Sequence, residues 1–144
     1  MSSPQWMQDV VSSRFDHDIF PFWEGLKEGH FLLNRCRRCE KHYWPMTLCP
    51  CSDDATFEDM EWVPTSGRGT IFSYGVVMRA PQPAWQSEVP YAAILVELEE
   101  GPIFPTRLSG RAPDDIAIGL AVEVDLQLVP ETGLTLPLFK IAST

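Results

Sequence analysis

The sequence is poor in positive charge and has no long apolar run. Its 11 lysine and arginine residues stand against 20 aspartate and glutamate residues, which leaves a formal net charge of -9 over 144 residues. Because nucleic-acid binding depends mainly on neutralising phosphates, this balance disfavours nucleic acid as a partner, and it disfavours an anionic membrane surface for the same reason. No stretch approaches the roughly 20 apolar residues that cross a bilayer, and the N-terminus lacks the basic start and apolar run of a secretory signal. We therefore expect a cytoplasmic protein.

Cysteine is absent outside one short segment. All four cysteines lie between Cys36 and Cys51 in paired spacing, and in a reducing compartment such clustering indicates metal binding more than disulfides. Cys36 and Cys39 have the C-x-x-C spacing of a zinc knuckle, and Cys49 and Cys51 follow after nine residues. Two facing turns that carry four thiolates supply the tetrahedral set that structural zinc prefers. We predict structural zinc held by these four cysteines.

The second cysteine pair is one residue shorter than the usual knuckle. In an extended C-x-C segment the two side chains point to opposite sides, so both thiolates reach one ion only if the backbone turns. The sequence leaves open that His42, Asp53 or His30 replaces Cys51 in the ligand set, or that the ribbon holds no metal.

Motifs of a self-sufficient enzyme are also missing. The chain has no G-x-S-x-G, phosphate-loop or G-x-G-x-x-G motif. Its three histidines, His17, His30 and His42, stand apart from any evident nucleophile. Arg37 and Arg38, beside the cysteines, either stabilise the thiolates or meet an anionic ligand. We expect no catalytic residue in this chain.

The chain divides into three segments of different pattern. Residues 1–30 combine a polar tail with a helical arm, residues 31–60 carry the cysteines as a zinc ribbon, and residues 61–144 change to a period of two. The tail has no clear period through residue 14, so we expect it to be loose.

The helical arm is predicted over residues 18–29. Asp18 is a candidate N-cap, Pro21 suits a first helical turn and Gly29 suits a helix end. One side of this helix carries large apolar residues, namely Phe22, Trp23 and Leu26. A helix this short needs a surface to pack on, and that surface is either its own barrel or a partner. We take the three residues as candidate partner contacts.

Five strand candidates separated by turn signals follow the ribbon. Clean alternation, as in 122–128, indicates one buried and one wet face. Five strands with a helical turn after the third are typical of an OB-type barrel, and residues 112–119 are long enough for that turn. The expected strands are 69–77, 91–98, 103–108, 122–129 and 134–141.

A proline-rich segment over residues 78–90 interrupts the strand pattern and should form a surface loop. Trp85 lies in it. A tryptophan on such a loop either packs on the barrel or contacts a ligand. The second alternative is open because OB folds bind ligands through loops of this kind.

The order of these parts resembles a known family. The residues that carry the resemblance are 22–26, 32–39, 43–45, 49–50, 67–74 and 90–91. The chain is similar to the family first catalogued as domain of unknown function thirty-five, a rubredoxin-like zinc ribbon followed by an OB fold. The similarity covers roughly residues 18–142, and only the shortened cysteine pair departs from the family's C-P-x-C pattern.

The resemblance implies a role beside a thiolase-like protein. The larger partner would hold the catalytic residues for thiolysis, condensation, acyl transfer or retro-aldol cleavage of steroid side-chain thioesters. The small chain would brace it and help to hold the acyl-CoA. An acidic body is poorly suited to capture anionic CoA alone, so local arginines or the partner must contribute positive charge. We take Arg37, Arg68, Trp85 and Tyr91 as candidate ligand-binding residues.

A rival interpretation is an independent binder of single-stranded nucleic acid with a ribbon and an OB fold. Such a binder needs a basic groove with stacked aromatic rings. The barrel segment has only five basic residues against ten acidic ones, so the accessory-subunit interpretation is preferred. A salt-dependent gel shift with short single strands separates the two.

Overall fold

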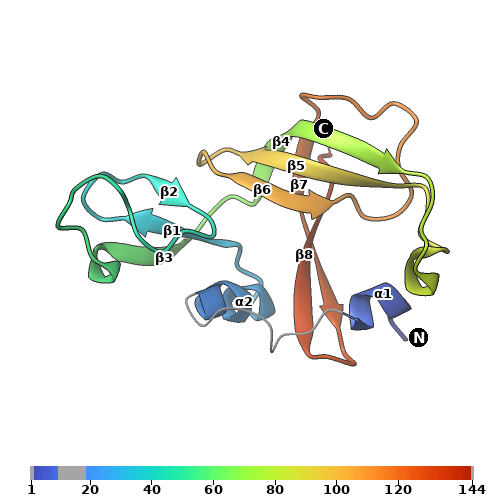
Figure 1. Cartoon of the computed structure of the whole chain (residues 1–144), viewed down its shortest axis with the longest axis horizontal. Helices are drawn as coiled ribbons and strands as arrows, with labels where there is room; N and C mark the ends of the chain where they lie inside the picture. The colour runs from blue at the N-terminus through green and yellow to red at the C-terminus, as the bar shows by residue number, and fades with distance from the viewer. Residues whose placement is uncertain (1, 10–18, 144) are drawn as a thin grey trace.

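Two antiparallel sheets and a pair of short helices make up the computed structural model, which describes residues 2–9 and 19–143 (Figure 1). The smaller sheet carries the cysteines and the larger one forms a barrel. The predicted mainly β architecture is confirmed. None of the helices in the described part of the chain is long and apolar enough to cross a bilayer.

The ribbon sheet has the strand order β2-β1-β3. Its strands are β1 (Leu32–Cys36), β2 (His42–Tyr43) and β3 (Met60–Pro64), and the 3-10 turn η3 (Phe57–Asp59) leads into β3. β3 pairs with β1 along its whole length, from Leu32 opposite Pro64 to Cys36 opposite Met60. The ribbon sheet therefore extends beyond residue 60, where the sequence pattern placed its end.

The larger sheet has the strand order β6-β5-β4-β7-β8 and curls into a nearly closed barrel. Its edges β6 and β8 meet at a bridge between Leu108 and Phe139, and the Thr106 hydroxyl donates a hydrogen bond to the Pro137 carbonyl at 2.8 Å. The five strands lie close to their predicted positions, at β4 (Arg68–Val77), β5 (Tyr91–Leu98), β6 (Ile103–Arg107), β7 (Ala121–Val129) and β8 (Leu134–Ile141).

The segment between β6 and β7 differs from the prediction, because residues 112–119 form turns and no helix. Ile71 explains the difference. Its N–H donates to the Leu120 carbonyl at 2.9 Å, and its own carbonyl accepts from the Gly119 N–H at 2.8 Å. Pairing with β4 uses the backbone groups that a helix would need for itself.

Helix α2 (Phe20–Lys27) is the predicted arm. Pro21 lies in its first turn, and Gly29 ends it with a φ of 85° while the His30 N–H donates to the Gly25 carbonyl at 2.9 Å. This left-handed ending favours glycine. The candidate cap Asp18 lies outside the described residues.

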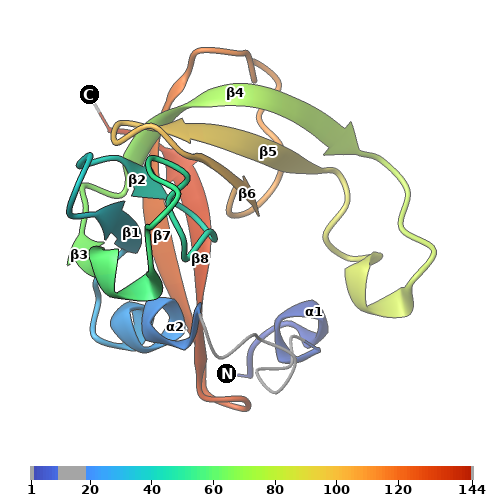
Figure 2. The same cartoon turned by 60° about the vertical axis from the view of Figure 1, so that its left-hand side comes forward.

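A second helix was not predicted. α1 (Gln5–Gln8) lies within the segment expected to be a loose tail, and its Trp6 is only 5% exposed. Trp6 packs against Val129, Leu136 and Leu138 of the β7–β8 hairpin. In Figures 1 and 2 the two helices flank this hairpin, α2 on the side of the ribbon and α1 on the other side. Trp6, with Met7 packed beside it, anchors a segment whose other residues are mostly polar.

The ribbon, the arm and the barrel meet at Phe22, which is fully buried. Its ring centroid lies 5.7 Å from Phe31, 5.5 Å from Trp44, 6.5 Å from Trp62 and 6.0 Å from Phe104. We call these five rings the aromatic junction. Because they come from all three parts, the junction fixes how the parts sit against one another.

Replacing Phe22 with alanine should lower the free energy of unfolding by about 3–5 kcal/mol, the usual cost of emptying a buried aromatic site. Denaturant unfolding followed by tryptophan fluorescence measures it. Phe20→Ala is the matched control, because Phe20 lies in the same helix and is 53% exposed. Equal effects of the two substitutions would contradict the central position of Phe22.

Candidate functional site

The four cysteine sulfurs form one cluster in which all Sγ atoms lie within 4.8 Å of one another. The Sγ atoms of Cys36 and Cys51 are 3.8 Å apart, and those of Cys39 and Cys49 are 3.5 Å apart. A tetrahedral zinc ion with Zn–S bonds of about 2.3 Å separates its sulfurs by about 3.8 Å. The donor set therefore fits a structural metal.

The local backbone explains how the shortened pair reaches the cluster. Pro50 and Cys51 lie in a turn rather than in extended chain, so Cys49 and Cys51 point to the same centre. On the facing side, a turn after β1 is closed by the Glu40 N–H, which donates to the Cys36 carbonyl at 2.8 Å. Cys51 completes the set, and the alternatives His30, His42 and Asp53 do not belong to it.

Tyr43 supports the cluster from β2. Its hydroxyl lies 3.3 Å from Cys49 Sγ, and this hydrogen bond lowers the pKa of Cys49 to about 6 while it raises the pKa of Tyr43 to about 12. The neighbouring Cys49 sulfur raises the pKa of Cys51 to about 12. A bound metal cation would hold all four cysteines as thiolates and would join the two turns that carry them. With four protein ligands, no coordination position would remain open for a substrate.

The arginines near the cluster pair with carboxylates of the ribbon. Arg37 contacts Glu61 at 3.2 Å, and Arg38 contacts Asp54 at 2.8 Å and Asp59 at 3.1 Å. Neither interaction involves a thiolate. The ribbon's own acidic residues therefore hold Arg37, which was a candidate ligand-binding residue.

Two of the four candidate ligand-binding residues come together and two do not. The rings of Trp85 and Tyr91 lie 5.3 Å apart. Arg68 begins β4, whereas Tyr91 pairs with Val77 at the other end of that strand. Nine residues of extended chain span roughly 30 Å, so Arg68 lies far from the tryptophan.

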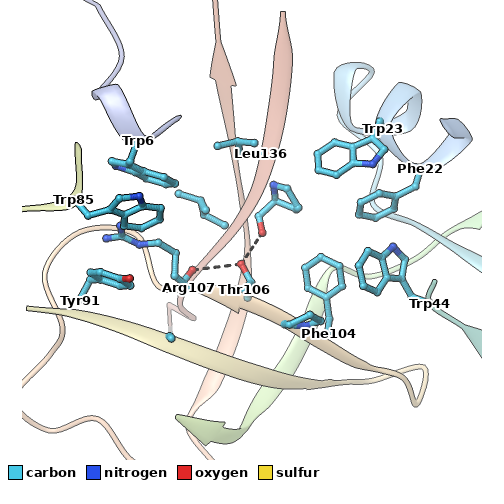
Figure 3. Close-up of a pocket in the computed structure, with 14 residues that line it drawn as sticks. Trp6, Phe22, Trp23, Trp44, Trp85, Tyr91, Phe104, Thr106, Arg107 and Leu136 are labelled. Carbon is cyan, nitrogen blue, oxygen red and sulfur yellow. Dashed lines mark hydrogen bonds between the residues drawn. The ribbon is translucent and has the colours of Figure 1, made fainter. Parts of the chain in front are cut away.

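Trp85 and Tyr91 form part of a pocket of about 400 Å³, which we call the aromatic pocket. Figure 3 shows two groups of rings facing each other across it, with β8 behind. Leu136, Pro137 and Leu138 of β8 line it together with Ala93, Pro105, Thr106 and Arg107. Its aromatic walls are Trp6, Trp85 and Tyr91 on one side and Phe22, Trp23, Trp44 and Phe104 on the other.

Arg107 is the residue of this site that sequence reasoning missed. Its guanidinium lies 4.8 Å from the Trp6 ring centroid and 4.4 Å from that of Tyr91. It contacts Glu88 at 3.3 Å and donates to the carbonyls of Leu108 and Gly110 at 3.1 Å each. Burial lowers the pKa of Arg107. Its one available signal was an arginine at the end of an apolar strand.

Trp6 and Trp44 were also missed as site residues, for different reasons. Trp6 belongs to α1, whose sequence has no helical period, and Trp44 lies in the ribbon beside the cysteines. The composition carried one signal, which is that the chain has five tryptophans. In the structure, four of them line this pocket.

A second hollow of about 380 Å³ shares the Trp85–Tyr91 wall. It is formed by residues 79–82 and Val77, and Arg79 is its charged member. Arg79 makes no ion pair with any residue that the structure describes. An apolar pocket and a hollow with an arginine that makes no ion pair among the described residues therefore share two rings.

The aromatic pocket can bind but lacks groups for covalent chemistry. Among the described residues that line it there is no cysteine, histidine or carboxylate. Glu88, which contacts the lining residue Arg107, is engaged in that ion pair. A nucleophile with a positioned base is therefore not part of this site.

The complete cluster predicts that Cys51→Ser loses bound zinc, as Cys36→Ser does, because each substitution removes one of four ligands. Elemental analysis of protein never exposed to added metal, together with the melting temperature, measures this. Ser52→Ala serves as the control. Full zinc content in Cys51→Ser would show that another group completes the site.

Replacing Arg107 with methionine should destabilise the fold by about 1.5–3 kcal/mol, the range for hydrogen bonds to a charged group. The carbonyls of Leu108 and Gly110 lose a buried donor, and Glu88, which is 21% exposed, loses its ion pair. The side chain of Arg107 is only 7% exposed. Arg79→Met is the matched control and should leave the urea midpoint nearly unchanged. The assignment is wrong if both variants unfold alike.

Two family descriptions match the chain in the order of its two sheets. The rubredoxin-like zinc ribbon domain of ChsH2 matches residues 23–58, and the C-terminal OB-fold domain of ChsH2 matches residues 62–127. The resemblance stated from the motifs is confirmed.

Individual relatives agree. A probable enoyl-CoA hydratase alpha subunit of Thermomonospora curvata is 41% identical over 123 residues, which cover 84% of this chain and only 37% of that subunit. A DUF35 domain-containing scaffold protein of Methanocaldococcus jannaschii is 32% identical over 121 residues, 82% of this chain and 83% of that protein. A chain of the Ltp2-ChsH2(DUF35) aldolase superposes with a TM-score of 0.76 at 36% identity, covering 90% of this chain and 98% of that one. The chain therefore belongs to the ChsH2/DUF35 family, which joins a rubredoxin-like zinc ribbon to an OB-fold domain.

Proposed function

We propose that the protein is a non-catalytic accessory subunit of a thiolase-like acyl-CoA enzyme, working in the cytoplasm and carrying a structural zinc ion. It stabilises the partner and helps to hold the acyl-CoA. The partner's reaction would be thiolysis or condensation, acyl transfer, or retro-aldol cleavage of steroid side-chain thioesters. The observation that carries the proposal is the aromatic pocket, which shares the Trp85–Tyr91 wall with the hollow of Arg79.

This pair of sites suits a ligand with one apolar and one anionic end. The aromatic pocket offers almost only carbon surface, whereas Arg79 supplies a positive charge that no described carboxylate neutralises. An acyl-CoA ester has both ends. In a chain with a net charge of -9, a single free arginine is a weak anion site, so the partner should contribute further positive charge.

The absence of catalytic groups supports an accessory role. Thioester chemistry needs a nucleophile or base with a positioned partner and an oxyanion site. The four cysteines form the metal cluster, and no histidine lines the described pocket. The relatives' names are consistent with this role, since they include an enzyme's alpha subunit, a scaffold protein and an aldolase assembly.

The exposed face of β4 is the surface that we propose for the partner. Phe72, Tyr74, Val76 and Met78 are 52%, 40%, 38% and 72% exposed, and residues 69–78 carry no charge. Contiguous apolar patches of this kind mark interaction sites. This surface replaces the helix as the docking element, because Phe22 and Leu26 are buried in the chain's own core and only Trp23 retains exposed surface.

Co-expression with a thiolase-like protein of the same organism, followed by affinity pull-down and a CoA-release assay, tests the proposal. The chain alone should show no turnover, and the complex should be active. Phe72→Glu combined with Met78→Glu should abolish co-purification, because two charges enter an apolar interface. Phe57→Glu is the matched control, since Phe57 is 65% exposed on the ribbon.

Two outcomes contradict the proposal. Robust thioester turnover by the chain alone would make it an enzyme in its own right. Failure of the unmodified chain to bind any thiolase-like protein of its organism would remove the accessory role.

A further inference from the structure

We infer that the aromatic pocket takes a bulky apolar acyl group and excludes the anionic carrier that delivers it. This inference rests on the proposed function and specifies which part of the thioester the chain holds. It also gives Arg107, the cation among the lining residues, a structural role and no role in ligand recognition.

Apart from Arg107, the pocket surface is almost entirely apolar. Phe22, Trp44 and Phe104 of the aromatic junction line one side together with Trp23, and Trp6, Trp85 and Tyr91 line the other (Figure 3). Leu136 and Leu138 of β8 complete the apolar lining. Thr106 and Tyr91 supply the hydroxyl groups of the lining. The Thr106 hydroxyl already donates to the Pro137 carbonyl at 2.8 Å, and the indole nitrogens of Trp6 and Trp44 are buried. A phosphate placed here would lose most of its hydration against a surface that is almost entirely carbon.

Arg107 does not offset that loss, because its charge is already used. Its Nη1 contacts Glu88 at 3.3 Å, and its Nε and Nη2 donate to two backbone carbonyls at 3.1 Å. The rings of Trp6 and Tyr91 lie 4.8 and 4.4 Å from the guanidinium carbon. An anion in the pocket would have to compete with Glu88 for a guanidinium whose nitrogens already have partners.

The volume indicates the size of the acyl group. A cavity of about 150 Å³ lined by aliphatic and aromatic side chains holds one benzene. The aromatic pocket encloses about 400 Å³, so it has room for roughly two to three rings of that size. An acetyl group would leave most of the apolar wall in contact with water and would gain little hydrophobic free energy.

Binding to the intact zinc-loaded chain tests the inference directly. The probes are 2-naphthoyl-N-acetylcysteamine, acetyl-N-acetylcysteamine and free CoA. Isothermal titration calorimetry and tryptophan fluorescence measure the affinity of each probe. Because Trp6, Trp23, Trp44 and Trp85 line the pocket, occupation should change the emission. We expect the naphthoyl thioester to bind at least tenfold more tightly than the acetyl thioester or free CoA.

A substitution that fills the pocket with a larger side chain tests whether the naphthoyl group binds there. Ala93 lines the pocket and is not a core residue, so Ala93→Phe adds a ring without emptying a packed site. It should weaken naphthoyl binding at least tenfold, whereas Ala121→Phe, an exposed position at the start of β7, should leave it unchanged. Circular dichroism checks that both variants fold.

The outcomes separate this inference from the proposed function. Equal affinities for the three probes, no measurable naphthoyl binding, or an Ala93→Phe variant that binds normally would overturn the pocket assignment even if a thiolase-like partner co-purifies. Tight naphthoyl binding that Ala93→Phe removes would support it even if no such partner is found.

Discussion

The packing of Phe22 against rings from the ribbon and the barrel is the constraint on which the rest of this structure depends. The ribbon is a small sheet of three strands, too small to form a hydrophobic core of its own, and a helix of eight residues is unstable in isolation. Both gain stability by burying apolar surface at the junction. A metal ion held by the four cysteines would fix the turns before and after β2, the strand that leads to Trp44. The Trp44 ring centroid lies 4.6 Å from that of Phe104 of the barrel.

The aromatic pocket is a consequence of this arrangement. Its walls come from α1, α2, the ribbon, the η4 turn (Pro83–Trp85) and strands β5, β6 and β8, so no part of the chain forms it alone. The buried ion pair of Arg107 and Glu88 ties β6 to the loop before β5. A site assembled from rigid, distant segments suits a subunit that positions a ligand for chemistry performed by a partner.

Local rules were sufficient for most of the fold. Alternation, a continuous apolar run over residues 91–98 and the turn signals between them predicted the barrel strands. The paired cysteines predicted the metal cluster, because both kinds of signal depend on neighbours in sequence. Tertiary contacts decided what was missed. Gly119 and Leu120, at the end of the segment expected to be helical, pair with Ile71. The helix around Trp6 exists because a distant hairpin offers Leu136 and Leu138. Arg107 could not be recognised as a site residue from the sequence. The aromatic rings and backbone carbonyls that it contacts come together only in the folded chain.

The most direct test of this account is an experimental structure of the chain bound to its thiolase-like partner and a bulky acyl-CoA. The account predicts that the acyl group lies between the two groups of rings, in contact with Trp85 and Tyr91, and that the phosphates lie outside the aromatic pocket. An acyl group held wholly within the partner, with this pocket occupied by the partner's side chains, would contradict it.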